Sequence, residues 1–210
     1  MRRLVTLAGA VLLSTVPTSA ARAQTAATDS TGFRAGQWGA EFTIGTGGGI
    51  ASGVGALRFF SDRRALLLDV NGRFTRASGE GPRRSDESSL HVRIGPRWYR
   101  PVKGRVLQYV SLGVIASHDR REIPVFSSSL DPMTRSTTKS FGAGTFGEVG
   151  GSWMVTPQLS LGASWQGVVQ YARQTQDARN LGGAIVVPAS RSNVWNASFG
   201  SLALRAGVFF

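Results

Sequence analysis

The stretch Ser201-Leu-Ala-Leu-Arg-Ala-Gly-Val-Phe-Phe210 alternates apolar side chains with small or polar ones. Successive side chains of a β-strand point to opposite faces, so this period of two predicts a strand with one apolar face. The apolar face carries Leu202, Leu204, Ala206, Val208 and Phe210, and the other face carries Ser201, Ala203, Arg205 and Gly207. Only Phe209 departs from the alternation, at the end of the strand. A strand apolar on one side and charged on the other requires two different surroundings for its two faces.

The same period recurs along the whole chain and predicts eight strands. Their approximate ranges are 37–45, 52–60, 66–75, 89–98, 106–118, 138–155, 159–171 and 194–210. Tight connections at 61–64, 101–105 and 155–158 alternate with longer ones at 77–86, 119–137 and 172–193, and the glycines at 47–49 turn the first hairpin. This pattern predicts an all-β protein, an eight-stranded antiparallel up-and-down transmembrane β-barrel, because such barrels have short turns at one end and longer loops at the other.

The N-terminal residues predict export. Met1-Arg-Arg3 is followed by an apolar run at 4–16 and by the small-residue site Ala21-Arg-Ala23, which is typical of a signal peptide cleaved after Ala23. The run is too short to cross a membrane as a helix, which needs about 20 apolar residues. We therefore expect a signal peptide at 1–23, a flexible N-terminal segment at 24–36 and the barrel at 37–210. The chain has no cysteine, so disulfides cannot stabilise the exported protein.

The charge of the chain is strongly positive, at +12. Only two of the basic residues are lysines, Lys103 and Lys139, and the arginines stand singly within alternating segments. Nucleic-acid binding needs basic residues gathered along a stripe or patch. The scattered pattern indicates ion pairs inside the barrel and contacts with anionic lipid head groups instead, and no nucleic-acid partner.

The aromatic residues fall near the predicted strand ends, as expected of the girdles at the two membrane interfaces. Under the eight-strand threading, one end collects Trp38, Phe59, Trp98, Trp153 and Phe210, and the other collects Phe74, Tyr171 and Trp195. A soluble barrel or sandwich would also alternate but has no reason to place aromatics in this way.

From about Gln37 onward the chain resembles the small eight-stranded outer-membrane barrels, such as the membrane domain of OmpA, OmpX and OmpW. The last strand, ending at Phe210, resembles the C-terminal assembly signal of bacterial outer-membrane barrel proteins. The resemblance implies location in the outer membrane of a Gram-negative bacterium. It also implies contact with outer-membrane lipid and lipopolysaccharide, and recognition of the C-terminal strand by the barrel-assembly machinery.

The predicted barrel interior is polar. An eight-stranded barrel is only wide enough to be filled by side chains, so we expect a plug of paired charges rather than an open pore. The charged residues assigned to the interior are Glu41, Arg58, Asp69, Arg73, Arg93, Arg97, Glu148 and Arg205, joined by His91, Tyr99, Gln166 and Gln170. On the adjoining first strand, Glu41 is a candidate partner of Arg205. The alternative is a network that opens and forms a narrow channel for small solutes.

A lipid acyl hydrolase of the outer membrane is the second alternative, since acyl transfer needs a serine beside a histidine oriented by a carboxylate. The candidate sets are Glu87, Ser89 and His91, and Ser117, His118 and Asp119. The barrel lipid hydrolases that these sets resemble have the order His-x-Ser, whereas the first set here has Ser-x-His; in the second set Ser117 and His118 point to opposite faces. We therefore expect no enzyme.

Two further motifs lack the context that their chemistry requires. Gly142-Ala-Gly-Thr-Phe-Gly147 matches a dinucleotide fingerprint, but no helix is predicted after it. The two histidines, His91 and His118, stand alone without cysteines. No catalytic, cofactor or metal site is predicted.

The long connections are where an extracellular ligand would bind. They contain two apolar runs, Ala184-Ile-Val-Val-Pro188 and Ile123-Pro-Val-Phe126, which would cap the barrel mouth or contact a partner. The sequence thus predicts a non-enzymatic protein with a structural or surface-interaction role through its outer loops.

Overall fold

A computed structural model describes residues 32–46, 50–77, 85–125, 134–180 and 186–210. The predicted signal peptide at 1–23 lies outside these residues. Among the residues described, no helix is long and apolar enough to cross a membrane.

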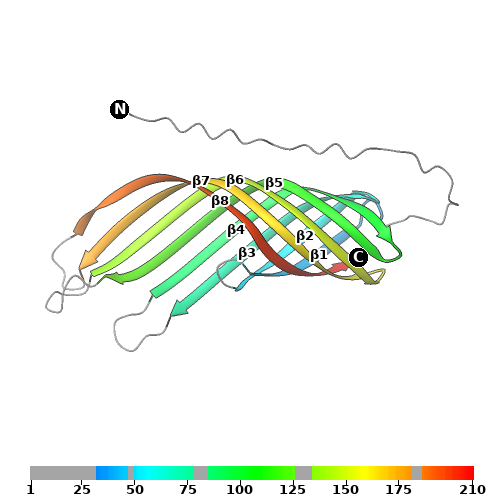
Figure 1. The fold of residues 1–210 in the computed structure, drawn as a ribbon, viewed down its shortest axis with the longest axis horizontal. Helices are drawn as coiled ribbons and strands as arrows, with labels where there is room; N and C mark the ends of the chain where they lie inside the picture. The colour runs from blue at the N-terminus through cyan, green and yellow to red at the C-terminus, as the bar shows by residue number, and fades with distance from the viewer. Residues whose placement is uncertain (1–31, 47–49, 78–84, 126–133, 181–185) are drawn as a thin grey trace.

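The described chain forms a closed barrel of eight antiparallel strands (Figure 1). Each strand pairs with the next along the chain, and the first pairs with the last, as predicted. The strands are β1 (Trp38–Thr46), β2 (Ile50–Ser61), β3 (Arg64–Ala77), β4 (Ser85–Lys103), β5 (Val106–Val125), β6 (Thr134–Thr156), β7 (Leu159–Asn180) and β8 (Val186–Phe209). The connections at 62–63, 104–105 and 157–158 lie at the same end as the C-terminus, here named the turn end; the opposite end is the loop end.

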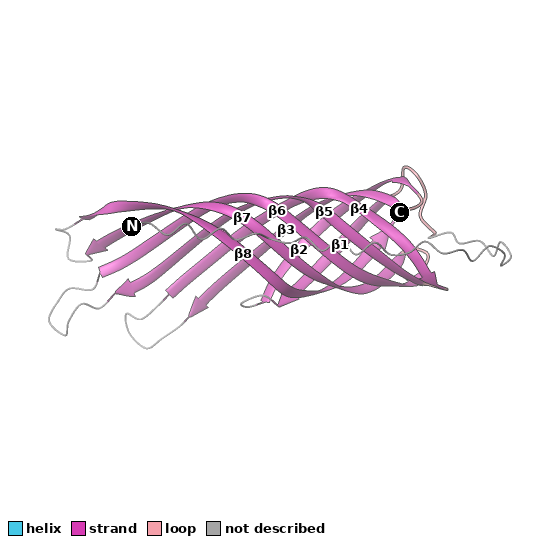
Figure 2. Cartoon of the chain, turned by 45° about the horizontal axis from the view of Figure 1, so that its top comes forward, coloured by secondary structure: helices cyan, strands magenta, loops and turns pink. Residues whose placement is uncertain are grey.

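The strands extend farther toward the loop end than the sequence predicted (Figure 2). Most of the expected loops at 119–137 and 172–193 is paired strand: β5 and β6 pair out to Val125 and Thr134, and β7 and β8 pair out to Arg179 and Val186. Most residues of these extensions are polar whichever face they occupy, so hydropathy shows no sustained period of two there, and only pairing with a neighbouring strand reveals them. Of the two apolar runs, Ala184, Ile185 and Phe126 lie outside the described residues.

The outer surface of the barrel is an apolar band. Val110, Leu112 and Val114 of β5 face outward, as predicted, and the apolar face of β8 is likewise exposed from Leu202 to Phe210. Trp38, Trp98 and Trp153 face outward toward the turn end, while Phe74, Tyr171 and Trp195 do so toward the loop end.

Two predictions about β2 are wrong. Arg58 lies on the outer surface, with its guanidinium over the ring of Trp38 at 4.7 Å from the centroid, and is not part of the interior. Phe59 is buried inside and is not part of a girdle. Leu57 and Phe59 flank one arginine, a pattern compatible with either orientation. The register decides between them, because Arg58 pairs with outward-facing Trp38.

A bulge in β8 reverses which residues face outward. Gln166 pairs with Ser201 and Gly167 pairs with Phe199, so Gly200 is the extra residue. Its φ of +92° is a conformation that favours glycine. The outward residues are consequently even-numbered from Leu202 onward and odd-numbered up to Phe199, which keeps both apolar series on the lipid-facing side.

An aromatic cluster closes the turn end from inside. Phe33 is only 4% exposed, and its ring centroid lies 4.3 Å from that of Phe59, 4.8 Å from Phe209 and 5.0 Å from Tyr99. Of the predicted flexible segment at 24–36, the structure describes only residues 32–36, and Phe33 among them lies inside the barrel. The burial of Phe209 also explains its departure from the alternation, because it faces inward beside outward-facing Phe210.

Candidate functional site in the barrel lumen

A network of charged side chains crosses the lumen next to the aromatic cluster. The charged side chains lie on the inward faces of β1, β3, β4, β6 and β8. Its members are Glu41, Asp69, Arg93, Arg97, Glu148 and Arg205, all buried. A buried charge is tolerated only when it is paired and hydrogen-bonded, so the contacts of each group decide whether this network is stable.

Arg97 is the centre of the network and is 0% exposed. Its Nη1 donates to both carboxylate oxygens of Glu41, at 2.7 and 2.8 Å, and its Nη2 donates to Glu148 Oε2 at 3.1 Å. Its Nε donates to Ser111 Oγ at 2.8 Å, and the guanidinium lies 4.3 Å from the centroid of the Tyr109 ring. Each of its three nitrogens therefore has a partner, and one arginine joins carboxylates from opposite sides of the barrel.

Arg205 joins the same carboxylates from β8. Its Nη1 lies 2.9 Å from Glu41 Oε2, so the predicted pairing across the closing strands is confirmed. Its Nη2 lies 2.7 Å from Glu148 Oε1 and 3.6 Å from Asp69 Oδ2. Arg93 completes the network by donating to Asp69 and to Gln166 Oε1.

The charges of this network balance, with three arginines against three carboxylates. The sequence predicted five arginines inside, but Arg58 faces outward and Arg73 lies beyond the network toward the loop end, where its Nε donates to Thr75 Oγ1 at 3.2 Å. Because the charges are balanced, the network needs no counter-ions. This ring of contacts joins β1, β3, β4, β6 and β8 across the lumen and is here named the plug.

Several plug residues were missed by the sequence analysis because they are small or uncharged. Ser111, Ser164, Thr43 and Tyr109 all contact the arginines or glutamates. Each lies on the inward face of its strand, so the alternation alone could have identified them.

A cavity of about 220 Å³ lies beyond the plug toward the loop end. Eight of its twelve lining residues are polar, among them the predicted interior residues His91, Gln166 and Gln170, together with Arg93 and Asn71. Within the described chain, Arg93 Nε and Gln170 Oε1 have no hydrogen-bond partner. At about 30 Å³ per water molecule, the cavity has room for several waters that could satisfy these atoms.

The two candidate catalytic sets meet across β4 and β5. Ser89 pairs with Asp119 and His91 pairs with Ser117, while His118 faces outward. His91 Nε2 lies 3.4 Å from Asp119 Oδ1. However, Ser117 is 2% exposed and its Oγ has no hydrogen-bond partner among the described residues. The histidine thus contacts a carboxylate but makes no described hydrogen bond to this serine, and Glu87 lies opposite Arg121 in the strand register.

The glycine motif at 142–147 lies within β6, and strand continues beyond it to Thr156. Two of its glycines allow close packing between strands: a Cβ at Gly144 would lie 2.1 Å from Val169 O, and one at Gly142 would lie 2.7 Å from Ser117 Oγ. The described residues contain no cluster of three or more His, Asp or Glu suited to a metal ion.

Comparison with known proteins places the fold. No protein-family model matches the sequence, and no curated protein does. Among solved structures, a major outer membrane protein from Thermus thermophilus matches with a TM-score of 0.60 and 14% identity, over 83% of this chain and 98% of that one.

Two weaker likenesses are to Ail, the attachment invasion locus protein of Yersinia pestis, and to Neisserial surface protein A. Ail matches with a TM-score of 0.40 and 13% identity, over 83% of this chain and 95% of its own. Neisserial surface protein A matches with a TM-score of 0.39 and 16% identity, over 82% and 94%. TM-scores as low as 0.40 and 0.39 do not establish a shared fold. The stronger likeness shows the fold alone, which is that of a bacterial outer-membrane β-barrel.

Proposed function

We propose that the protein is a closed, non-enzymatic barrel of the Gram-negative outer membrane, with its turn end toward the periplasm and a surface-interaction role at its loop end. The plug supports the first half of this proposal. Passage of a solute would require breaking the contacts of Arg97 with both Glu41 and Glu148, and each carboxylate left unpaired inside the barrel would be costly.

The parts of the strands that extend beyond the apolar band support the surface-interaction role. Tyr171 and Trp195 pair across β7 and β8, with ring centroids 5.2 Å apart, and mark the loop-end limit of the band. Beyond them the strands continue to Asn180 and Val186. The protein thus presents a rigid sheet above the membrane rather than only loops.

This sheet has an open edge. β1 pairs with β8 only as far as Leu202, and no described residue pairs with that side of β8 from Val186 to Val194. Unpaired backbone groups at a strand edge are a template for an extended segment of another protein. Figure 1 shows the cause, since the β1–β2 hairpin ends far short of the other strands.

Attachment measurements test the interaction role. Replacing residues 176–190 by Asn-Gly would remove the outer part of the open edge, residues 186–190, while keeping the register Thr175↔Arg191. We expect cells that display this variant to lose attachment to serum-protein-coated glass and cell–cell aggregation. As a matched control, residues 122–137 of the β5–β6 hairpin are replaced in the same way, and attachment is kept. Equal attachment of both variants and of cells lacking the protein would contradict the interaction role.

Single-channel recording on the purified, reconstituted protein tests the closed lumen. We expect no steady conductance. A stable open level would instead favour the narrow-channel alternative. Release of fatty acid from phospholipid that depends on His91 would favour the lipid acyl hydrolase.

A further inference from the structure

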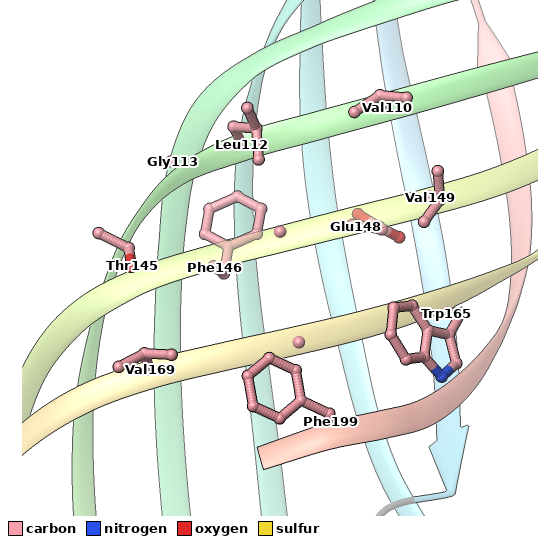
Figure 3. Close-up of a pocket in the computed structure, with 12 residues that line it drawn as sticks. Val110, Leu112, Gly113, Thr145, Phe146, Glu148, Val149, Trp165, Val169 and Phe199 are labelled. Atoms are coloured by element: carbon pink, nitrogen blue, oxygen red, sulfur yellow. The ribbon is translucent and has the colours of Figure 1, made fainter. Parts of the chain in front are cut away.

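An apolar groove runs across the outer surface of β5, β6, β7 and β8 (Figure 3). Its volume is about 540 Å³. Gly147 and Gly167 contribute no side chain to it, while Leu112, Trp165 and Phe199 line it with large apolar groups. The outer wall is therefore hollowed where these two glycines lie.

Basic side chains lie on the outward faces of the same four strands, nearer the loop end. They are Arg120, Lys139, Arg173 and Arg191, here named the basic arc; all four are exposed. Phe141, Tyr171 and Trp195 lie between this arc and the groove. The arc therefore sits immediately beyond the last aromatic residues, at the level where lipid head groups begin.

The charges of the arc are poorly compensated within the protein. Arg120 and Lys139 are directly opposite each other, a cross-strand pair of like charges that destabilises a sheet. Arg120 pairs with Glu122 on its own strand. Lys139 and Arg173, by contrast, have no ion-pair partner among the described residues. An anion bound between Lys139 and Arg173 would neutralise Lys139 and so relieve the repulsion between Arg120 and Lys139.

The arc does not continue from β5 onto the neighbouring strand β4. On β4, the outward positions after Leu90 are Ser88 and Asp86 rather than basic residues. A phosphate-rich head group would therefore be bound on the groove side of the barrel and not all around it.

The spacing of arc and groove matches one membrane leaflet. Lys139 and Thr145, the groove residue of β6 nearest the arc, are six positions apart on the strand, about 20 Å at 3.3 Å per residue. At a tilt of about 45° this corresponds to about 14 Å of depth, close to half of the ~25 Å apolar band. An acyl chain that starts at the arc reaches the groove.

We propose that the arc and the groove together bind one phosphorylated, multiply acylated lipid of the outer leaflet. Lys139 and Arg173 hold its phosphate, Arg120 and Arg191 flank it, and the end of one acyl chain enters the groove beside Gly147. This inference rests on the membrane orientation proposed above. The lipid would be bound specifically to one side of the barrel, unlike the lipid that surrounds the remaining surface.

The test measures lipid retained by the full-length protein. The protein is purified in detergent, incubated with bisphosphorylated lipid A, with dephosphorylated lipid A or with inorganic phosphate, and analysed by native mass spectrometry. We expect retention of bisphosphorylated lipid A and roughly tenfold weaker retention by the K139Q/R173Q variant, since charge-assisted contacts are lost. The K139R/R173K variant, which keeps both charges, is expected to retain lipid.

Groove variants test the acyl chain separately. A Cβ at Gly147 would meet only Leu112 Cδ2, at 3.5 Å, so Gly147→Leu fills the groove without a backbone clash. We expect it to reduce lipid A retention severalfold. The matched controls are Gly151→Leu, outside the groove on the same strand, and Arg100→Gln, at the turn end; both should retain lipid.

Three results would overturn the proposal: equal retention by K139Q/R173Q and the unaltered protein, equal retention of the dephosphorylated lipid, or occupancy by inorganic phosphate that excludes lipid. Heat-dependent gel migration of the membrane fraction is measured in parallel. It reports whether each variant is a folded membrane barrel, so failure of the membrane placement is distinguished from failure of the lipid site.

Discussion

The two halves of the lumen are built differently, although the same eight strands enclose both. The half toward the turn end holds the balanced plug and, next to it, the aromatic cluster around Phe33. The half toward the loop end holds a polar cavity of about 220 Å³, with the half-exposed pair of His91 and Asp119 near its rim. The buried ion pairs and the ring contacts therefore lie in the half toward the turn end, and the open volume lies in the half toward the loop end.

This difference follows from how well each half of the lumen excludes water. Near the turn end, aromatic rings remove water from the neighbourhood of the ion pairs, which strengthens each contact and makes an unpaired charge costly. Near the loop end, water enters and screens the charges, so individual pairs contribute little. Substitutions at matched positions in the two halves should consequently differ in effect.

The largest effect is expected from Arg97→Met. The substitution leaves Glu41 and Glu148 without their main partner inside the barrel, and we expect a loss of about 3–5 kcal/mol in the free energy of unfolding. Urea titration in lipid vesicles, followed by heat-dependent gel migration, measures it. The double variant that adds Glu41→Gln keeps the buried charges balanced and leaves Glu148 paired with Arg205, so it should recover much of the loss. A change below about 1 kcal/mol in Arg97→Met would mean that the plug is hydrated, as the other half is.

The next effect is expected from Phe33→Ala, which tests the aromatic cluster. Removing a buried phenylalanine costs about 3 kcal/mol when the space cannot collapse, and Phe33 contacts three aromatic rings. The same urea titration applies. Phe60→Ala is the matched control, because Phe60 is exposed on the outside of the barrel and should lose much less. Equal losses for both would show that the cluster does not close the lumen.

A smaller effect is expected from Gly200→Ala, at the bulge that reorients β8 between the two halves. An alanine is strained at φ +92°, and we expect a loss of about 1–2 kcal/mol. Gly151→Ala serves as the control, since its φ is ordinary and its Cβ would meet nothing nearer than 3.9 Å. An unchanged unfolding midpoint for Gly200→Ala would argue against the bulge.

The smallest effect is expected from His91→Gln. His91 and Asp119 are each 39% exposed, so their contact should be worth less than about 1 kcal/mol. Gln170→Ala, at another residue of the cavity lining whose Oε1 has no hydrogen-bond partner among the described residues, gives a comparison within the same half. A loss as large as that of Arg97→Met would remove the distinction between the two halves.

Much of the fold could be predicted because lipid imposes a strict alternation. A strand in the apolar band must be apolar outside, so Leu202 to Phe210, Leu66 to Val70 and Leu90 to Trp98 each fix their own orientation. The same rule assigned Glu41, Asp69, Arg93, Arg97, Glu148 and Arg205 to the interior. The prediction failed where lipid no longer acts: beyond the band most residues are polar whichever face they occupy, and the sequence predicted loops where the strands continue to Asn180 and Val186.

The sequence by itself determined the class of fold, the strand order and the inward face of most strands, because each follows from a period of two that one chain segment contains. Only the tertiary structure decided the orientation of Arg58, the burial of Phe33 and the partners of Arg97. These depend on register and on contacts between strands far apart in the chain. The even charge balance of the plug is likewise visible only in three dimensions, because a side chain joins the network through its position around the barrel and not through its neighbours in sequence.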